Sequence, residues 1–377
     1  MSEIPRDSQV ESSLSLLSEG YTFISSRCQR FGSDLFQVRL LMQNTICMSG
    51  EEAARLFYDE RLFQREHAAP HMLQKTLFGR GGVQGLDGDA HRHRKQLFLS
   101  LLGDEAVAEL VRLSEASWQA AIEAWQRCDR VVLLPEVQAI LTRAVCEWAG
   151  VPLGDDEVTL RRDQLAAMID GAGGVGIRHW HARKARKAAE DWLIELIRGV
   201  RNGALRIDDS RALAVVARYR DANGVELDER VAAVELLNLL RPTVAVARFV
   251  IYAALELLAH PEWRPRLQRE DALLEPSPRK FVVCTPSFRS PRRACARISS
   301  GGATVSRRAR GYCWTFMAPI ETPGSGRNRK PSIPSASSIG MAALITSSRK
   351  GAEMWQAATV ARASLWPLRF WSARCAC

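Results

Sequence analysis

The residue pair Arg241-Pro242 stands inside the most apolar stretch of the chain, which runs from about Glu226 to His260. A proline inside a helix removes one backbone hydrogen bond and costs about 3 kcal/mol, so helix interiors normally exclude it. An arginine is a permanent cation, and burying it requires an anionic partner. No acidic residue follows Arg241 at the third or fourth position. The pair predicts either a kinked helix with an arginine that snorkels to solvent, or a buried cation whose anion comes from outside.

Two pairs of histidines, His91/His93 and His179/His181, raise the question of a metal site. Side chains two positions apart on a helix point about 200° apart. Neither pair can therefore chelate one ion if these segments are helical. The nine cysteines form no C-x-x-C pair with the spacing of a zinc site. The sequence predicts no metal site built from histidines or paired cysteines.

The run GAGGVG at 171–176 has the composition of a phosphate-binding loop. It follows no strand pattern and lacks the Lys-Ser/Thr ending that would contact a nucleotide. A flexible connection between two helices explains it better. The segment from Arg178 to Arg198 then carries a basic stripe, which fits the solvated face of a helix.

The elements that must position Arg241 are mainly helical. Residues 34–48, DLFQVRLLMQNTICM, alternate in part between apolar and polar and predict strands of a small sheet. Apolar residues then recur three or four apart in segments 51–58, 89–102, 101–126 and 135–150. Gly150 and Pro152 end the last of these segments in the usual order. The stretch around Arg241 is apolar nearly all round and predicts the longest helix, which would cross the interior.

Charge divides the chain near Pro276. The 377 residues have a net charge of +10, but from Pro276 to Cys377 there are 17 lysines and arginines against Glu321 and Glu353. That segment carries +15 and leaves the body at −5. The hydrophobic content of 46% suits a globular core, and the N-terminus MSEIPRDSQV lacks the pattern of a signal peptide. The body predicts a soluble, cytoplasmic protein without a membrane span.

Three stretches resemble the fatty-acid peroxygenase branch of the cytochrome P-450 superfamily. They are LFYDERLFQREHAAP (56–70), LFGRGGVQGLDGDAHRHRKQLFLSLL (77–102) and LLNLLRPTVAVARF (236–249), and Arg-Pro is the most specific mark. The resemblance covers about residues 1–275. It implies a mainly α fold with a small β region, haem as cofactor, and hydroxylation or decarboxylation of long-chain fatty acids with hydrogen peroxide. It also implies that no redox partner is needed.

The resemblance also implies roles for individual residues. Arg241, beside Pro242, would bind the fatty-acid carboxylate by a charge-assisted contact, and the carboxylate would then move protons on the peroxide. Gln84 would face the distal haem pocket, with Leu77 and Phe78 lining the acyl channel. Four basic residues would be candidates for the haem propionates: His91, Arg94, Lys95 and Arg65.

The last third of the chain departs from this family. The superfamily needs an E-x-x-R pair and a loop F-x-x-G-x-x-x-C-x-G whose cysteine binds the iron, and neither follows Pro276. Two segments, 298–319 and 351–363, can be back-translated and read one base earlier. With suitable codons, the first can give DFEWRGYRFPPGTRVLLDLYGT, which has a sheet-and-turn pattern. The second can give GGGDVASGHRCPGE, which is similar to the haem loop. We therefore predict a frameshift between about Phe281 and Thr285.

These observations predict two segments: an incomplete cytochrome P-450 catalytic domain at 1–280, and an aberrant basic tail at 281–377 that is disrupted or disordered. Two other functions remain open from the residues alone. The chain could be a non-catalytic fatty-acid-binding remnant that uses Arg241. The basic tail could instead bind nucleic acid, with an affinity that falls steeply with salt, although it has no recognisable binding module.

Overall fold

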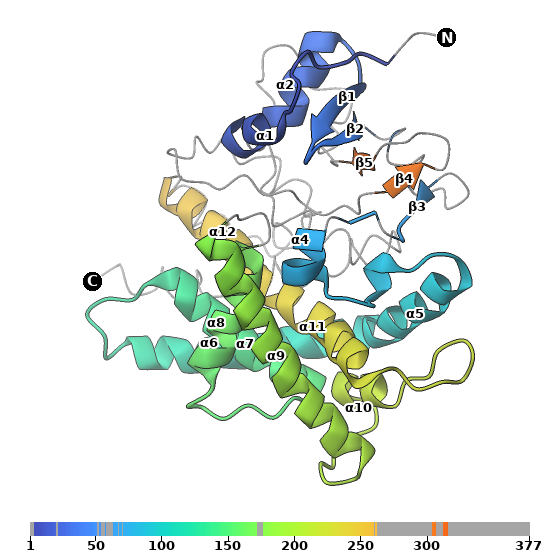
Figure 1. Ribbon diagram of the computed structural model, residues 1–377. Helices are drawn as coiled ribbons and strands as arrows, with labels where there is room; N and C mark the ends of the chain where they lie inside the picture. The colour runs from blue at the N-terminus through green and yellow to red at the C-terminus, as the bar shows by residue number, and fades with distance from the viewer. Residues whose placement is uncertain are drawn as a thin grey trace.

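The computed structural model describes residues 4–19, 22–50, 53, 57, 63–66, 68–69, 71–171, 176–259 and 261, and the backbone of 304–306 and 312–315. The helical elements are α1 (Ser13–Glu19), α2 (Thr22–Phe31), α4 (His71–Leu73), the π-helix η1 (Gln74–Phe78), the 3-10 helix η2 (Val83–Gly85), α5 (Gly88–Leu101), α6 (Asp104–Trp125), α7 (Leu133–Ala149), α8 (Val158–Asp170), α9 (Ile177–Arg201), α10 (Ala212–Ala217), α11 (Glu229–Ala245) and α12 (Ala247–Ala259). The larger part of the molecule is helical, and a small sheet lies beside α1 and α2 at one end (Figure 1). The predicted mainly α fold with a small β region is confirmed.

Among the described residues, the sheet has five strands in the order β1-β2-β5-β4-β3. They are β1 (Leu35–Leu40), β2 (Gln43–Met48), β3 (Phe63–Gln64), β4 (Thr304–Ser306) and β5 (Tyr312–Thr315). Of the strand pairs that the structure describes, only β2–β5 is parallel. The β1–β2 hairpin matches the strands predicted at 34–48, and alternate residues of β1 are buried, as on a sheet with one covered face.

The tight turn of this hairpin, Leu41-Met42, has positive φ at both residues, 49° and 62°. Such a backbone normally selects glycine or asparagine. Here the carboxylate of Glu11 accepts hydrogen bonds from both backbone N–H groups, at 3.1 and 3.0 Å. A contact from a residue 30 positions away therefore helps to hold a turn that its own residues disfavour.

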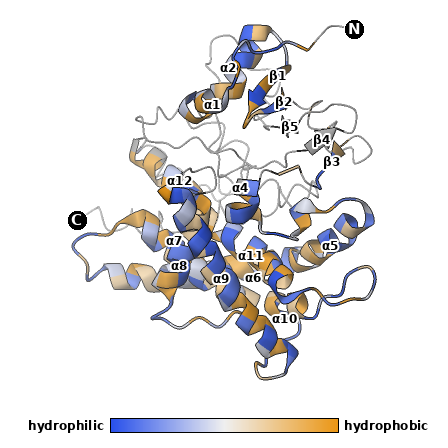
Figure 2. Cartoon of the chain, viewed as in Figure 1, coloured by the Kyte–Doolittle hydropathy of each residue, from blue (hydrophilic) through white to orange (hydrophobic). Residues whose placement is uncertain are grey.

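The main hydrophobic core lies between the long helices. Its largest fully buried side chains come from α6, α7, α8, α9, α10 and α11: Trp118, Leu110, Leu141, Leu165, Met168, Leu193, Ile197, Leu213, Leu236 and Leu237. Hydrophilic residues lie along α9 on the side toward the viewer in Figure 2. Helix α7 ends as its sequence predicts, because Gly150 adopts a left-handed conformation with φ of 71°.

A second core cluster connects the sheet to the helical part. It contains Phe23, Phe36 and Val38 together with Leu77 and Phe78 of η1. Burial at this junction fixes η1 between the β region and the helices that carry the candidate site. Within the described part of the chain, no helix is both long enough and apolar enough to cross a membrane.

The prediction of one long helix from Glu226 to His260 is wrong. The structure has two helices, α11 and α12, divided at Val246, and the longest described helix is α9 with 25 residues. Helix α11 starts later than predicted because Asp228 caps it, accepting from the backbone N–H groups of the second and third residues that follow. It ends with a tightened turn, in which the N–H of Val246 bonds to the carbonyl of Thr243 at 3.1 Å.

Some sequence predictions lie outside the described residues. Of the segment 51–58, only Ala53 and Phe57 are described, and both are helical. Within 171–176, the flanking glycines end α8 and precede α9, as expected for a connection between helices. The predicted tail at 281–377 is described only at β4 and β5, which join the sheet of the body.

Candidate functional site

Arg241 lies on α11 and only 4% of its surface is exposed. Its Nη1 donates to the carbonyl of Leu77 on η1. No other described residue contacts the guanidinium by a hydrogen bond or an ion pair. Burial and the nearby guanidinium of Arg186 lower the pKa of Arg241 to about 9, so it remains a cation at neutral pH. The interpretation as an arginine that snorkels to solvent is wrong, and a buried cation that lacks an internal anion is what the structure shows.

Pro242 lies inside α11 and is buried. It has no N–H to donate to the carbonyl of Asn238, four residues earlier. The next residue, Thr243, donates its hydroxyl to the carbonyl of Leu239 at 3.1 Å, a contact that bends helices. The backbone around Arg241 is therefore irregular in its hydrogen bonding, while the helix continues for another turn.

A second guanidinium meets the same carbonyl as Arg241. Arg186 on α9 is 3% exposed, and its Nη1 donates to the carbonyl of Leu77 at 2.7 Å. Its Nε bonds to Glu190, one turn later on the same helix, at 2.6 Å. Burial lowers the pKa of Arg186, and Glu190 opposes that shift. Two buried cations thus converge on one neutral acceptor.

Gly79 directly follows η1, and Arg186 packs against it where a side chain would otherwise lie. Its φ is +81°, and a Cβ there would lie 2.2 Å from Nη2 of Arg186 and 2.6 Å from a methyl group of Val234. We expect Gly79→Ala to destabilise the chain by roughly 2–4 kcal/mol, since it adds overpacking to a left-handed backbone. Urea unfolding measures this change.

Gly203 is the matched control for this substitution. Its φ is +78°, but nothing lies within 4 Å of the position of its Cβ. Gly203→Ala should cost only the backbone part, about 1 kcal/mol. Equal losses at the two positions would contradict the tight packing of Arg186 against Gly79.

Glu235, on α11, anchors a second buried polar network. Its carboxylate is fully buried and pairs with Nη1 of Arg94 on α5 at 2.7 Å. Nδ2 of Asn238 donates to the other carboxylate oxygen at 3.0 Å and to Oε1 of Gln84 at 3.2 Å. Burial raises the pKa of Glu235, and the guanidinium of Arg94 opposes that shift.

This network orients the amide of Gln84. A carboxylate only accepts, so Asn238 must turn its donor toward Glu235. Nδ2 of Asn238 also donates to Oε1 of Gln84. Nε2 of Gln84 is therefore left buried without a partner in the described part of the chain. The residue predicted to face the haem pocket thus has a free N–H donor.

The other predicted residues divide into two groups. The side chains of Leu77 and Phe78 are buried in the second core cluster, and Leu77 contributes its carbonyl to the site. His91 is buried on α5 and Lys95 is half-buried one turn later. Arg65 lies 3.9 Å from Asp87, whose carboxylate also accepts from the backbone N–H of Arg65 at 2.8 Å.

Sequence reasoning missed Arg186, Glu235 and Asn238. Glu235 and Asn238 did carry a signal, because they precede Arg241 at intervals of three and lie on one face of an apolar helix. Arg186 stood within a basic stripe and had no such signal. Its partner carbonyl is 109 residues away in the chain.

None of the described cysteine side chains fits the axial ligand of a haem iron. Burial raises the pKa of Cys28 to about 11 and that of Cys146 to about 12, so both remain thiols. Cys47 is buried in β2, and Cys128 is exposed just after α6. Among the described residues, no group of three or more His, Cys, Asp or Glu could hold a metal ion.

No protein-family model matches the chain. Solved structures do match. Cytochrome P450EX alpha (CYP152N1) with myristic acid is 40% identical, over 71% of this chain and 65% of that chain, with a TM-score of 0.68. Cytochrome P450SP alpha (CYP152B1) in complex with (R)-ibuprophen is 32% identical, over 95% and 91%, with a TM-score of 0.75. A variant of cytochrome P450 OleT in complex with arachidonic acid is 28% identical, over 74% and 67%, with a TM-score of 0.71.

The arrangement of the helices and the sheet is the cytochrome P-450 fold, and Arg-Pro lies in its central helix. Within that superfamily, whose cofactor is haem, the chain belongs to the CYP152 family. The resemblance found in the sequence is therefore confirmed. The chain spans 65% of the length of cytochrome P450EX alpha.

Identity to cytochrome P450SP alpha falls as the matched region grows. It is 42% over 74% of the chain for one structure and 32% over 95% for another. The longer match therefore adds about a fifth of the chain and almost no identical residues. The identical residues therefore lie within about three quarters of the chain.

Proposed function

We propose that this chain derives from an enzyme that hydroxylates or decarboxylates long-chain fatty acids with hydrogen peroxide, and that Arg241 binds the fatty-acid carboxylate. The observation that carries this proposal is the buried guanidinium of Arg241, which no acidic side chain of the described residues neutralises. A buried cation without an anion is costly, and a carboxylate would balance it. Fatty acids in the structures of cytochrome P450EX alpha and cytochrome P450 OleT support the same class of ligand.

When a fatty acid binds, its carboxylate would replace the carbonyl of Leu77 as the acceptor for Arg241. Nη1 of Arg241 donates to the neutral carbonyl of Leu77, and a carboxylate is the stronger, charged acceptor. Leu77 and Phe78 would contact the acyl chain, since each methylene buried in an apolar site contributes about 0.8 kcal/mol. Gln84 would offer its free Nε2 to a polar group on the distal side of the haem.

Haem would supply the oxidation of the substrate when it is bound. His91, Lys95, Arg65 and Arg94 are the candidates for its propionates. In the structure, Nη1 of Arg94 pairs with Glu235, while its buried Nε has no partner among the described residues. The cysteines whose side chains are described do not fit its axial ligand. We therefore derive no oxidation step for this polypeptide. Hydrogen peroxide contains oxygen that is already reduced by two electrons, so no redox partner is needed to deliver them, and none is proposed.

We also propose the division into a catalytic domain remnant at 1–280, placed in the cytoplasm, and an out-of-frame tail at 281–377. The restriction of identical residues to about three quarters of the chain supports this division, since residues 1–280 make up a similar share. The second candidate function is a fatty-acid-binding protein without catalysis. It is favoured by the retention of Arg241 alongside described cysteines that do not suit the iron.

The experiment compares two ligands of the full chain, the 12-carbon fatty acid and the 12-carbon alcohol, by titration calorimetry. The acid should bind about 30-fold more tightly or better, since it completes a buried ion pair and the alcohol does not. Both ligands bury the same acyl chain, so the ratio isolates the carboxylate. Equal affinities for the acid and the alcohol would contradict the proposed role of Arg241.

A further inference from the structure

The carbonyl oxygen of Leu77 accepts from two buried guanidinium groups, those of Arg186 and Arg241. A neutral carbonyl balances the charge of neither group. Arg186 has its own counterion in Glu190, at 2.6 Å on the same helix. Arg241 has none among the described residues. The two arginines are therefore not equivalent: one is held in place and the other is available to an anion.

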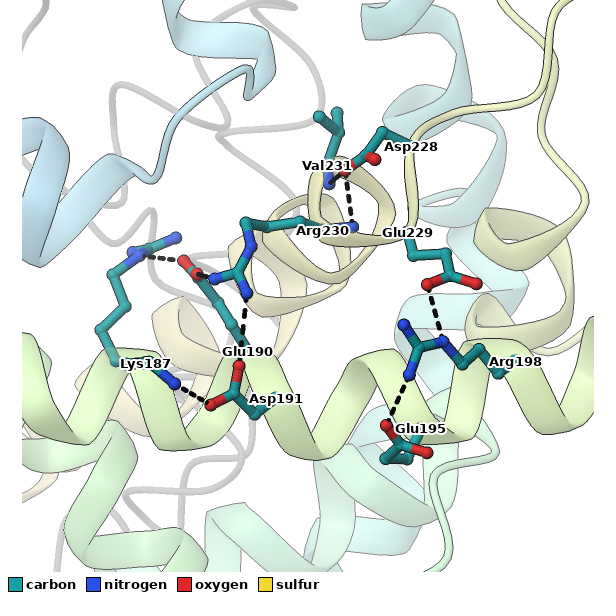
Figure 3. A network of polar contacts seen from close by, with 10 residues as sticks. Lys187, Glu190, Asp191, Glu195, Arg198, Asp228, Glu229, Arg230 and Val231 are labelled. Atoms are coloured by element: carbon teal, nitrogen blue, oxygen red, sulfur yellow. Dashed lines mark hydrogen bonds and ion pairs between the residues drawn. The ribbon is translucent and has the colours of Figure 1, made fainter.

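A chain of ion pairs holds Arg186. Glu190 also accepts from Arg230 on α11 at 3.1 Å, Arg230 reaches Asp191 at 3.4 Å, and Asp191 pairs with Lys187 at 2.6 Å. Figure 3 shows these alternating charges running between α9 and the start of α11. The network runs from exposed Lys187 to the 3% exposed Arg186. Arg186 therefore keeps its position without help from Arg241.

We infer that Arg186 is a positioning residue of the carboxylate site, which retains the carbonyl of Leu77 when Arg241 turns from that carbonyl to the substrate. This inference rests on the proposed function of Arg241. A buried carbonyl that loses its donor carries the cost of an unsatisfied acceptor. With Arg186 in place, the departure of Arg241 leaves Leu77 still bonded.

This arrangement makes a specific distinction between ligands. A carboxylate draws Arg241 away from Leu77, because an anion is a better acceptor than a carbonyl. An alcohol does not, because its hydroxyl is no stronger an acceptor than the carbonyl that Arg241 already has. Loss of Arg186 should therefore weaken the binding of acids and leave that of alcohols unchanged. A purely structural role would weaken both.

The test is Arg186→Met in the full chain, with affinities for the 12-carbon acid and alcohol measured by calorimetry. We expect the acid to bind about 10-fold more weakly, and the alcohol to change less than twofold. Arg186→Lys keeps a charge and a donor of similar reach and should retain most of the preference for the acid. If Arg186→Met does not fold, as judged by circular dichroism, Arg186→Leu, which also has no donor for the carbonyl of Leu77, replaces it with the same expectation.

Arg161→Met is the matched control. Arg161 on α8 has the same type of bond to an acid four residues earlier, the N-cap residue Glu157, at 2.6 Å, and its guanidinium lies over the ring of Trp192. Arg161→Met should lower the free energy of unfolding and leave the ratio of acid to alcohol affinity unchanged. An unchanged ratio in Arg186→Met, or an equal loss for both ligands, would overturn the inference. Failure of the proposed function is distinguishable, because the unmodified chain would then show no preference for the acid.

Discussion

Arg241→Met is expected to weaken binding of the 12-carbon fatty acid by about 30-fold or more and, at the same time, to make the ligand-free chain more stable. Removing one partner of a buried charge pair costs about 2–5 kcal/mol of binding. Without ligand, however, Arg241 is a buried cation with no acidic partner among the described residues. Replacing a buried charge by an apolar side chain of similar volume can stabilise a fold by about 1–4 kcal/mol. Calorimetric titration and urea unfolding measure the two effects.

Opposite signs for binding and stability separate a ligand-binding arginine from a structural one. Arg248→Met, on α12, is the control, since Arg248 already pairs with the exposed Asp170. It should change stability by less than about 1 kcal/mol and leave binding unchanged. A loss of stability in Arg241→Met would contradict the assignment, because it would mean that the contact with Leu77 outweighs the cost of the buried charge.

The pH dependence of stability gives a further check on the same variant. Burial lowers the pKa of Arg241 to about 9, from 12.5 for an exposed arginine. The folded chain then binds fewer protons than the unfolded chain between these values, so the penalty is fully present below pH 9 and is relieved above it. The stability advantage of Arg241→Met should therefore shrink as the pH rises above 9.

The parts of this site that sequence could predict are those in which a residue conflicts with its neighbours along the chain. Arg241 was predictable because a permanent cation followed by proline does not suit an apolar helix. The β1–β2 hairpin and the end of α7 at Gly150 were predictable because alternation and glycine act locally. In each case the residues that determine the local structure lie within a few positions of one another in the sequence.

The parts that sequence could not predict depend on contacts between distant segments. Arg186 meets Leu77 across 109 residues, and Arg94 meets Glu235 across 141. Periodicity shows that these residues lie on helices but not which helix faces which. The break at Val246 was missed for a related reason. The residues on both sides of it are equally apolar, so no change of pattern marks the end of α11.

Correction of the proposed frameshift is expected to have the largest effect. The chain as written should show no haem-thiolate absorbance, and the corrected chain should show the full thiolate band in a carbon monoxide difference spectrum. In the chain as written, burial keeps Cys28 and Cys146 protonated, and a thiol does not replace a thiolate as the ligand of iron. With suitable codons, the predicted frame would place a cysteine codon across Val360 and Ala361, inside a sequence similar to the haem loop of the superfamily. Expressing both forms and recording the spectra tests this directly.

The control keeps the corrected frame and replaces that single new cysteine by serine. It should restore the sequence that completes the core and raise the cooperativity of unfolding, since a chain that lacks a third of its domain leaves apolar surface uncovered. It should nevertheless show no thiolate band. A thiolate band from the uncorrected chain would show that one of its own cysteines binds the iron. The absence of a band from the corrected chain would show that the body and the shifted tail are not parts of one enzyme.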